Sequence, residues 1–273
     1  MAKTPTKRRA TRRISLFAFL LTVTTIPRLS FAQPSIYSEI APTGKLRVAM
    51  SALIPALLTR TADGTVVGGV AVEVGKFIAE KLGVPFELVP YANQNLYMQS
   101  FGKGEWDIGF GTRTPLVADK GEFVVDVVLS DYVFMAAPGR EFADAAQVDR
   151  PGVKIAVGEN TTSDQFLTRT LKSAELVRTT PAGGGVSEAF RSGKADVYAA
   201  SASIVQQAIV KLPGAKLVPG TFTSDSYMAT LPKGKSSTAQ SKIFEIVREA
   251  KKSGIVRKAI EQLGLKGVRA APD

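Results

Sequence analysis

Two short polar segments carry the residues of this chain that are best suited to hold a small molecule. Gly111-Thr112-Arg113 follows the apolar run 108–110, and Thr161-Thr162-Ser163 lies between the apolar run 153–157 and a helix-like segment. Free backbone N–H groups at a helix start, with hydroxyls beside them, bind carboxylates and other anions. A guanidinium grips a carboxylate through paired hydrogen bonds. Both segments therefore predict binding of a small polar or anionic ligand.

Each segment also has a purely structural interpretation. The hydroxyl of Thr161 would cap the helix that follows it, and this role is compatible with ligand binding. Arg113 is also able to pair with Asp107, Glu105 or another surface acid. These alternatives stay open from the sequence alone.

The absence of two residue types restricts the chemistry. The chain has no Cys and no His, so it offers no thiol nucleophile, no imidazole base and no thiolate or imidazole metal ligand. Carboxylates, lysines and hydroxyls are still available for catalysis. We nevertheless predict a binding protein rather than an enzyme, with no catalytic residues, no metal site and no cofactor.

The N-terminus has the pattern of an export signal. A basic stretch without acids spans residues 3–13, a short apolar run spans 16–23, and Ser30-Phe31-Ala32 is a small-x-small cleavage pattern. We expect residues 1–32 to be a signal peptide, because the apolar run is too short for an ordinary membrane anchor. No cysteine follows for lipid attachment. We therefore expect a periplasmic protein that is not embedded in the membrane.

The export signal also explains most of the positive charge. Seven of the 35 Lys and Arg lie in residues 1–32 and none of the 24 acids do, so the remainder carries 28 basic and 24 acidic residues, a net charge of +4 rather than +11. Without a basic run interleaved with aromatic residues, nucleic-acid binding loses its support. About 240 residues remain, enough for two modest domains.

A repeated phrase indicates two lobes of similar plan. Gly104-Glu105-Trp106-Asp107 and Gly193-Lys194-Ala195-Asp196 each precede a short apolar strand. Strand-like runs at 46–50 and 153–157 precede the two phrases in the same order. Extended and helical segments alternate around them, which favours mostly parallel sheets flanked by helices. The expected strands are 45–51, 85–89, 132–137, 153–157, 176–178 and 223–231, and the expected helices include 93–101, 186–191 and 203–210.

We predict a two-lobed α/β fold. Lobe 1 comprises residues 33–134 and 228–273, and lobe 2 comprises residues 135–227. The last helices have no sheet of their own and are expected to dock on lobe 1. Two extended crossings between the lobes act as hinges, and closure about such hinges traps a ligand in the cleft.

These segments resemble the family 3 extracellular solute-binding proteins, the receptors of ABC importers for polar amino acids. The resemblance covers about residues 44–267. It rests on the repeated Gly-x-x-Asp phrases and on Gly44-Lys45-Leu46-Arg47-Val48, Gly64 with Val67-Gly68-Gly69, Lys81-Leu82-Gly83, Ile155-Ala156-Val157-Gly158 and Ser253-Gly254. The resemblance implies a type II periplasmic-binding-protein-like fold, an interlobe ligand site and a membrane permease as partner.

The chain departs from this family where an amino acid is held. The turn Thr114-Pro115 is present, but Leu116 and Val117 occupy the place at which the resemblance leads us to expect an arginine for the α-carboxylate. Ser201 occupies the place of the aspartate that binds the α-ammonium. Losing a partner at a buried charge costs about 3–5 kcal/mol. We therefore expect a ligand other than a standard α-amino acid.

Further residues at predicted strand ends are candidates for the cleft. Ser51 ends the first strand, and Tyr91 follows the second together with Asn93 and Gln94. The apolar segment 52–58 is interpreted mainly as loop packing, and Trp106 as a packing residue beside its turn. Tyr227 lies at a crossing and belongs either to the hinge or to the cleft.

The combined expectation is a monomeric receptor whose ligand contacts come from a defined set of residues. These are Ser51, Tyr91, Gly111, Thr112, Arg113, Thr161, Thr162, Ser163 and Ser201. Its partners are a small-molecule ligand and the permease of an ABC importer. The alternatives are an enzyme on the same scaffold, of the cyclohexadienyl dehydratase type, and a receptor that presents its ligand to a membrane sensor. The enzyme would need a cleft carboxylate such as Glu73 or Glu159 as general acid.

Overall fold

The computed structural model describes residues 1–2, 36–179 and 184–272. The predicted signal peptide therefore lies almost wholly outside the described residues. Residues 34–273 form one compact unit, and all that follows concerns that unit. Among the described residues, no helix combines the length and apolar character needed to cross a membrane.

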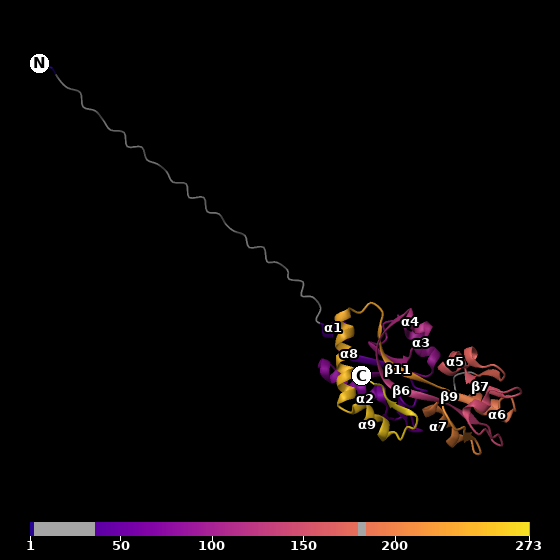
Figure 1. Cartoon of the computed structure of the whole chain (residues 1–273). Coiled ribbons are helices and arrows are strands. Elements are labelled where there is room, and N and C mark those ends of the chain that lie inside the picture. Colours follow the sequence, from indigo (N-terminus) through magenta and orange to yellow (C-terminus); the bar gives the residue numbers. More distant parts are fainter. Residues whose placement is uncertain (3–35, 180–183, 273) are drawn as a thin grey trace. The chain divides into compact units, whose positions relative to one another are not determined.

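One large sheet runs through the unit, with helices on both sides (Figure 1). The strands are β1 (Leu46–Ser51), β2 (Thr59–Arg60), β3 (Val66–Gly68), β4 (Phe86–Tyr91), β5 (Ile108–Thr112), β6 (Gly121–Ala136), β7 (Lys154–Gly158), β8 (Glu175–Thr179), β9 (Val197–Ser201), β10 (Lys216–Leu217), β11 (Thr223–Pro232) and β12 (Val268–Ala270). The helices are α1 (Ile36–Ile40), α2 (Val70–Leu82), α3 (Gln94–Ser100), α4 (Pro115–Ala118), α5 (Thr162–Thr170), α6 (Gly184–Arg191), α7 (Ala202–Lys211), α8 (Ser237–Lys252) and α9 (Ile255–Gln262), with a 3₁₀ turn at Ala145–Val148.

The strand order separates two parallel groups. Along the sheet it reads β4-β1-β5-β11-β6-β9-β7-β8. Strands β4, β1 and β5 are parallel to one another, and so are β9, β7 and β8. The antiparallel strands β6 and β11 lie between the groups and run from one group of helices to the other (Figure 1). These two strands are the two predicted crossings, and the predicted two-lobed α/β architecture is confirmed.

Each lobe has its own hydrophobic core. The larger core packs β1 and β5 against α2, α8 and α9, with Val48, Ile78 and Ile243 fully buried. In the second lobe, one cluster packs β7 and β9 against α5, a second packs β6 and β9 against α6 and α7, and a third joins Ala156 of β7 to Ala189 of α6. The predicted docking of the last helices on lobe 1 is confirmed by these contacts. The predicted boundaries at 134/135 and 227/228 fall within continuous strands and stay a prediction.

Burial explains why the first strand becomes continuously apolar after Arg47. Val48, Ala49 and Met50 have no exposed surface although their side chains alternate between the two faces. Helices cover both faces of a parallel sheet, so neither face needs polar residues.

The repeated Gly-x-x-Asp phrase makes the same contact in both lobes. Gly104 and Gly193 have φ angles of 70° and 67°, a left-handed conformation that glycine adopts without strain. In lobe 1, Asp107 Oδ2 accepts a hydrogen bond from the backbone N of Arg47 at 2.9 Å. In lobe 2, Asp196 Oδ2 accepts one from the backbone N of Lys154, also at 2.9 Å. Each aspartate thus fixes its strand against the first strand of its lobe.

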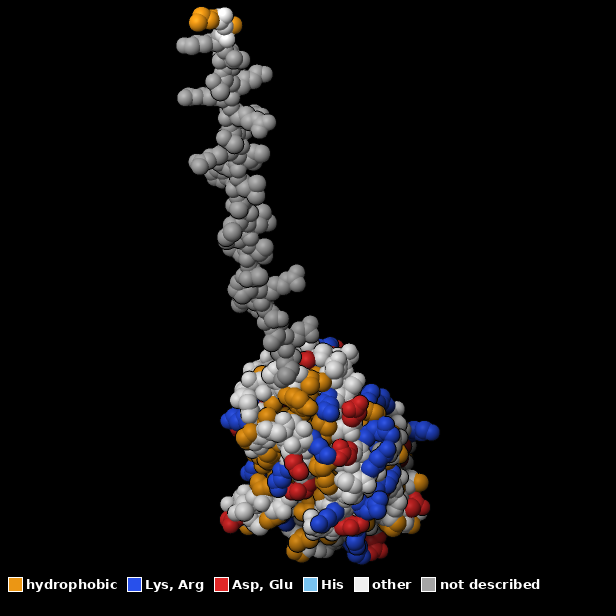
Figure 2. All heavy atoms as spheres, turned by 90° about the vertical axis from the view of Figure 1, so that its left-hand side faces the viewer, with side chains coloured by type: hydrophobic (Ala, Val, Ile, Leu, Met, Phe, Trp, Pro, Cys, Tyr) orange, Lys and Arg blue, Asp and Glu red, His pale blue; other side chains and the backbone are white. Residues whose placement is uncertain are grey.

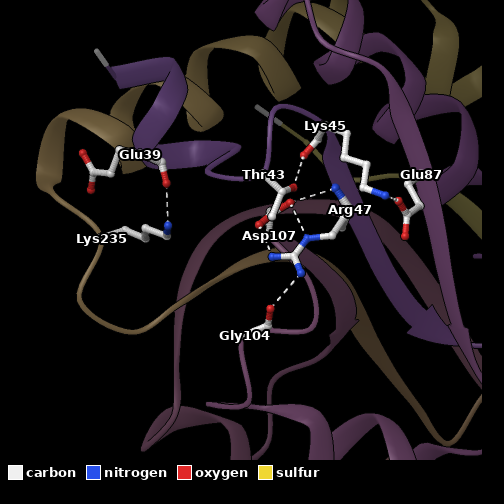
Figure 3. A network of polar contacts seen from close by, with 8 residues as sticks. All are labelled: Glu39, Thr43, Lys45, Arg47, Glu87, Gly104, Asp107 and Lys235. Atoms are coloured by element: carbon white, nitrogen blue, oxygen red, sulfur yellow. Dashed lines mark hydrogen bonds and ion pairs between the residues drawn. The ribbon is translucent and has the colours of Figure 1, made fainter. Parts of the chain in front are cut away.

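A guanidinium reinforces the contact in lobe 1. Arg47 donates to both carboxylate oxygens of Asp107 and to the carbonyl of Gly104 at 2.7 Å (Figure 3). Beside it, Lys45 pairs with Glu87 of β4. The Asp107 side chain is only 2 % exposed, so its charge is neutralised by a partner that the fold holds in place.

The C-terminal segment joins the sheet and also contacts α7 of lobe 2. Strand β12 pairs with β6 at Val128–Ser130, and Arg269 donates to Asp131 Oδ1 at 2.7 Å. The amide of Gln206, on α7 of lobe 2, donates to the carbonyl of Gly264 at 3.0 Å and accepts from the backbone N of Lys266 at 3.2 Å. This connection was not predicted from the sequence.

One face of the described part of the chain carries charges of both signs. On the face shown in Figure 2, Lys and Arg side chains lie among Asp, Glu and exposed apolar side chains. This mixture agrees with the small net charge of residues 33–273.

Candidate ligand-binding cleft

A cavity of about 360 Å³ lies where the parallel strands of both lobes end. Five of its lining residues are the last residues of their strands: Ser51 of β1, Thr112 of β5, Gly158 of β7, Thr179 of β8 and Ser201 of β9. The carboxyl ends of parallel strands, at the edge where the two halves of the fold meet, are the usual ligand position of open α/β sheets. The topology therefore places polar groups from both lobes around one space.

The lining is rich in hydroxyls and poor in charge. Its polar members are Ser51, Thr112, Tyr132, Thr161, Thr162, Thr179, Ser187, Tyr198, Ser201 and Tyr227, with the amides Gln94, Asn160 and Gln207. Among the described lining residues, Lys211 is the only charged one. Gln94 Oε1 is shielded from water and has no hydrogen-bond partner within the described part of the chain. An unpaired acceptor at this place is suited to a donor on a ligand.

Five of the nine predicted contact residues line this cavity. They are Ser51, Thr112, Thr161, Thr162 and Ser201. Ser51 and Ser201 are each 1 % exposed, and the hydroxyl of Ser201 lies 3.4 Å from that of Ser203. That they bind a ligand stays a prediction.

Two of the predicted contact residues, Tyr91 and Gly111, do not line the cavity. Tyr91 is the last residue of β4, and its hydroxyl donates to Glu105 Oε2 at 2.6 Å, within lobe 1. Gly111 lies against the ring of Tyr97, where a Cβ atom would stand 3.0 Å from Cε1. Neither is among the residues that line the cavity.

Arg113 and Ser163 are also absent from the lining. The guanidinium of Arg113 lies 4.9 Å from the centre of the Phe123 ring, and the side chain is exposed. Asp107, one of the acids considered as a partner of Arg113, pairs with Arg47 instead. Ser163 is 1 % exposed, and its Oγ has no hydrogen-bond partner among the described residues. The sequence located these residues beside the cleft but not the direction of their side chains.

The place of the expected carboxylate-binding arginine is buried. Val117 is 2 % exposed and packs with Tyr97, Phe101 and Trp106. Thr114 Oγ1 caps the short helix by accepting from the backbone N of Val117 at 3.3 Å. The packing interpretation of Trp106 is therefore confirmed. At the second anchor, Ser201 brings a neutral hydroxyl to the cavity.

The start of α5 combines capping with access to the cavity. Thr161 Oγ1 accepts from the backbone N of Asp164 at 3.3 Å and donates to the carbonyl of Gly158 at 2.7 Å. Thr161 is therefore the predicted N-cap. Thr162 Oγ1 donates to Asp225 Oδ2 at 3.2 Å, which links the helix to the crossing strand β11.

Asp225 is an acidic residue beside the cleft that the sequence did not predict, and it contacts the lining residue Thr162. Burial raises the pKa of Asp225, while the hydrogen bonds from Ser226 and Thr162 act in the opposite direction. The negative charge of Asp126 raises it further, and the positive charge of Arg113 lowers it. No motif marked this residue, because Thr162 and Asp225 are 63 positions apart and meet only through the strand register.

Two tyrosines of the crossing strands also face the cavity. Burial raises the pKa of Tyr132 well above its usual value, and burial likewise raises that of Tyr227. Both side chains therefore stay neutral hydrogen-bonding groups. Of the apolar segment 52–58, Leu53 and Ile54 line the cavity, whereas Ala56, Leu57 and Leu58 are buried in the core of lobe 1. The loop thus both packs and faces the cleft.

Comparison with known structures identifies the fold. No family model matches the chain. The structure of the solute receptor for L-cysteine of Neisseria gonorrhoeae superposes with a TM-score of 0.71 at 19% identity, over 86% of this chain and 99% of that one. A mutant of ArgBP from T. maritima gives 0.68 at 22% identity, over 84% and 99%. The chain has the type II periplasmic-binding-protein fold.

Two further relatives connect this type II fold with an enzyme. The ancestral amino acid-binding protein AncCDT-1, described as a precursor of cyclohexadienyl dehydratase, superposes with a TM-score of 0.69 at 22% identity, over 84% of this chain and 99% of that one. A cyclohexadienyl dehydratase of Pseudomonas aeruginosa is 28% identical over 170 residues, which cover 61% of this chain and 62% of that protein. The chain thus matches less than two thirds of that relative's length.

Proposed function

We propose that the protein is a periplasmic solute-binding receptor that captures a small polar or anionic molecule in its interlobe cleft and delivers it to the permease of an ABC importer. The observation that carries this proposal is the cavity at the strand ends, lined from both lobes by neutral hydrogen-bonding groups. Binding proteins for arginine and cysteine share the fold, which supports a receptor. An export signal in residues 1–32 agrees with such a role.

The ligand proposed for this receptor is not a standard α-amino acid. The lining offers hydroxyls, amides and one lysine, but no carboxylate for an α-ammonium among its described members. Val117 is turned into the core and is unavailable to any ligand. A zwitterion would leave its ammonium group without an acidic partner in the cavity, which is costly away from water.

A binding assay on the purified protein tests this proposal. Standard amino acids and small carboxylates are titrated, and Thr162→Val is compared with Thr170→Val, which lies at the other end of α5 with an exposed side chain. We expect a carboxylate to bind, and Thr162→Val to weaken binding by about tenfold, equivalent to one hydrogen bond of about 1.4 kcal/mol. Thr170→Val should leave the affinity unchanged. Equal effects of both substitutions, or none, would contradict a ligand at the α5 end of the cleft.

The alternative function is a dehydratase of the cyclohexadienyl type, which the relative from P. aeruginosa favours. Such an enzyme needs a general acid, and the cavity lining holds no carboxylate among its described residues. Glu73 is not among the residues that line the cavity, and it pairs with Lys76 on α2. Asp225, which accepts a hydrogen bond from the lining residue Thr162, would be the candidate acid. Turnover of prephenate or arogenate by the purified protein, lost in Asp225→Asn, would favour the enzyme over the receptor.

A receptor could also present its ligand to a membrane sensor instead of a permease. Cellular uptake of the identified ligand separates these partners. We expect a strain that lacks the protein to lose uptake of that ligand. Unchanged uptake with a lost transcriptional response would indicate a sensor.

A further inference from the structure

The cavity has a second part that extends beyond the cleft into lobe 2. Besides the hydroxyls at the strand ends, its lining includes Val186 of α6 and Ile204, Ala208 and Leu212 along α7 and its end. We call the space along these residues the α7 arm. About half of the residues along it are apolar, whereas most residues of the interlobe part are polar. Apolar side chains therefore form a larger share of the lining along α7 than between the lobes.

The α7 arm follows the length of a helix. Ile204, Gln207, Ala208 and Lys211 recur at intervals of three, four and seven residues, so they share one face of α7. With a rise of 1.5 Å per residue, Lys211 lies roughly 10 Å along the axis from Ile204 and roughly 15 Å from Ser201. The arm is thus long and starts at the strand end in the cleft.

The apolar wall of the arm is only partly covered by protein. Ile204, Ala208 and Leu212 are partly buried and pack on the cluster around Val133 and Met135, but they keep exposed surface toward the cavity. Removing apolar surface from water is favourable. An apolar ligand segment that lies along this wall would bind through that effect.

The charge of the cavity is concentrated at the end of the arm. Lys211 is in the last turn of α7 and is the only charged side chain among the described lining residues. Tyr198 also lines the cavity, and burial raises its pKa to about 12, so it stays neutral. A single cation at the end of an apolar channel is suited to one anionic group on a ligand.

We propose that the ligand is an elongated molecule with a hydrogen-bonding head in the cleft, an apolar body in the α7 arm and a terminal carboxylate at Lys211. This inference rests on the proposed receptor function and names the class of its ligand. It distinguishes this protein from a receptor for a compact zwitterion, whose ligand would fill only the interlobe part.

The probes that test the arm are unbranched hydroxy acids, from hydroxybutanoate to hydroxydecanoate, each with its hydroxyl on the carbon farthest from the carboxylate. The full chain is expressed, the protein is purified, and dissociation constants are measured by calorimetry, with the matching diols as uncharged controls. We expect affinity to rise by about tenfold or more from the shortest to the longest acid, and each long diol to bind about tenfold more weakly than its acid.

Two substitutions distinguish the contribution of the arm to ligand affinity from that of Lys211 at its end. Ala208→Phe fills the arm and should abolish the dependence on length, while Val210→Phe, on the exposed side of α7 with 82% exposure, should not. Lys211→Gln should make acids and diols bind equally, while Lys194→Gln, outside the cavity lining, should not. Affinity that is independent of length, or a length dependence that survives Ala208→Phe, would overturn the proposal.

Failure of the arm can be told apart from failure of the receptor. The purified protein is also exposed to a metabolite extract, and bound molecules are identified by native mass spectrometry. A compact ligand that binds to Ala208→Phe as tightly as to the wild type would support the receptor proposal and contradict the proposal of the α7 arm. If neither the extract nor any probe yields a bound molecule, both proposals are wrong.

Discussion

Asp107 and Arg47 are joined by three hydrogen bonds that fix β1 to the segment before β5. The carboxylate accepts hydrogen bonds from the backbone N, Nε and Nη2 of the same arginine, at 2.9, 3.1 and 2.7 Å. The equivalent aspartate of lobe 2, Asp196, keeps the backbone contact to Lys154 but pairs with Arg140, whose side chain is 61% exposed. In both lobes the aspartate of the repeated phrase thus accepts a hydrogen bond from the backbone of the first strand. Only in lobe 1 does it also form a buried ion pair.

This difference predicts unequal costs for the two aspartates. Asp107→Ala leaves the guanidinium of Arg47, only 15% exposed, without its partner, and we expect a loss of about 3–5 kcal/mol in the free energy of unfolding. Asp196→Ala should cost about 1–3 kcal/mol, since Arg140 regains water. Urea denaturation of both variants measures the difference. Equal losses would show that the ion pair adds nothing to the backbone contact.

The burial of Val117 predicts that an amino-acid site cannot be restored there by one substitution. Val117→Arg places a charge among Tyr97, Phe101 and Trp106, and we expect it to destabilise the fold by more than about 3 kcal/mol without creating amino-acid binding. Ala118→Arg, at the exposed neighbouring position, is the control and should be nearly neutral. Thermal unfolding and titration with amino acids check both. A stable Val117→Arg protein that binds an amino acid would contradict this placement.

Close packing at the C-terminal connection makes a further prediction. Gly267 has a φ of 66°, and a Cβ atom there would stand 2.7 Å from the Cβ of Ala202 on α7. Gly264 has a similar φ of 60° but open space around it. Gly267→Ala should therefore destabilise the protein more than Gly264→Ala, which suffers only the backbone strain of about 1 kcal/mol. Equal losses in the free energy of unfolding, measured by chemical denaturation, would mean that α7 moves away from residue 267 without a measurable loss of stability.

The raised pKa of Asp225 predicts a specific dependence of stability on pH. A carboxyl whose pKa is higher in the folded state favours folding below its unfolded pKa of about 3.9, and this contribution is lost as pH rises through the folded pKa. Relative to Asp225→Asn, the wild type should therefore be more stable in acid than at neutral pH. Urea unfolding of both proteins along a pH series measures the difference. A difference that stays constant, or grows in the other direction, would contradict the burial of this group.

The sequence predicted the fold well where apolar runs and glycine turns recur. Strands β1, β5, β7 and β9 each contain a short run of apolar or small residues, and this pattern follows from burial of both faces. The part of β6 at residues 121–131 was missed because Glu122, Asp126 and Asp131 interrupt its apolar residues, and β12 was missed because three residues carry no period. Both are strands only through pairing with partners distant in the chain.

The sequence located part of the cavity lining, and that these residues bind a ligand stays a prediction. Ser51, Thr112 and Ser201 line the cavity because a strand end fixes where a short side chain lies. Tyr91 and Arg113 have long side chains, whose directions are set by Glu105 and Phe123 rather than by their place in the strand. Asp225 and the α7 arm depend on packing between distant elements, which no local pattern encodes.

The most direct test of the receptor proposal is the identity of the bound molecule. Native mass spectrometry of the purified protein, after exposure to a metabolite extract, gives the mass of the ligand, and calorimetry with the pure compound gives its affinity. We predict a carboxylate without an α-ammonium group, bound more weakly by Thr162→Val. A standard amino acid that binds with micromolar affinity and is lost on substitution of Ser201 would contradict the account.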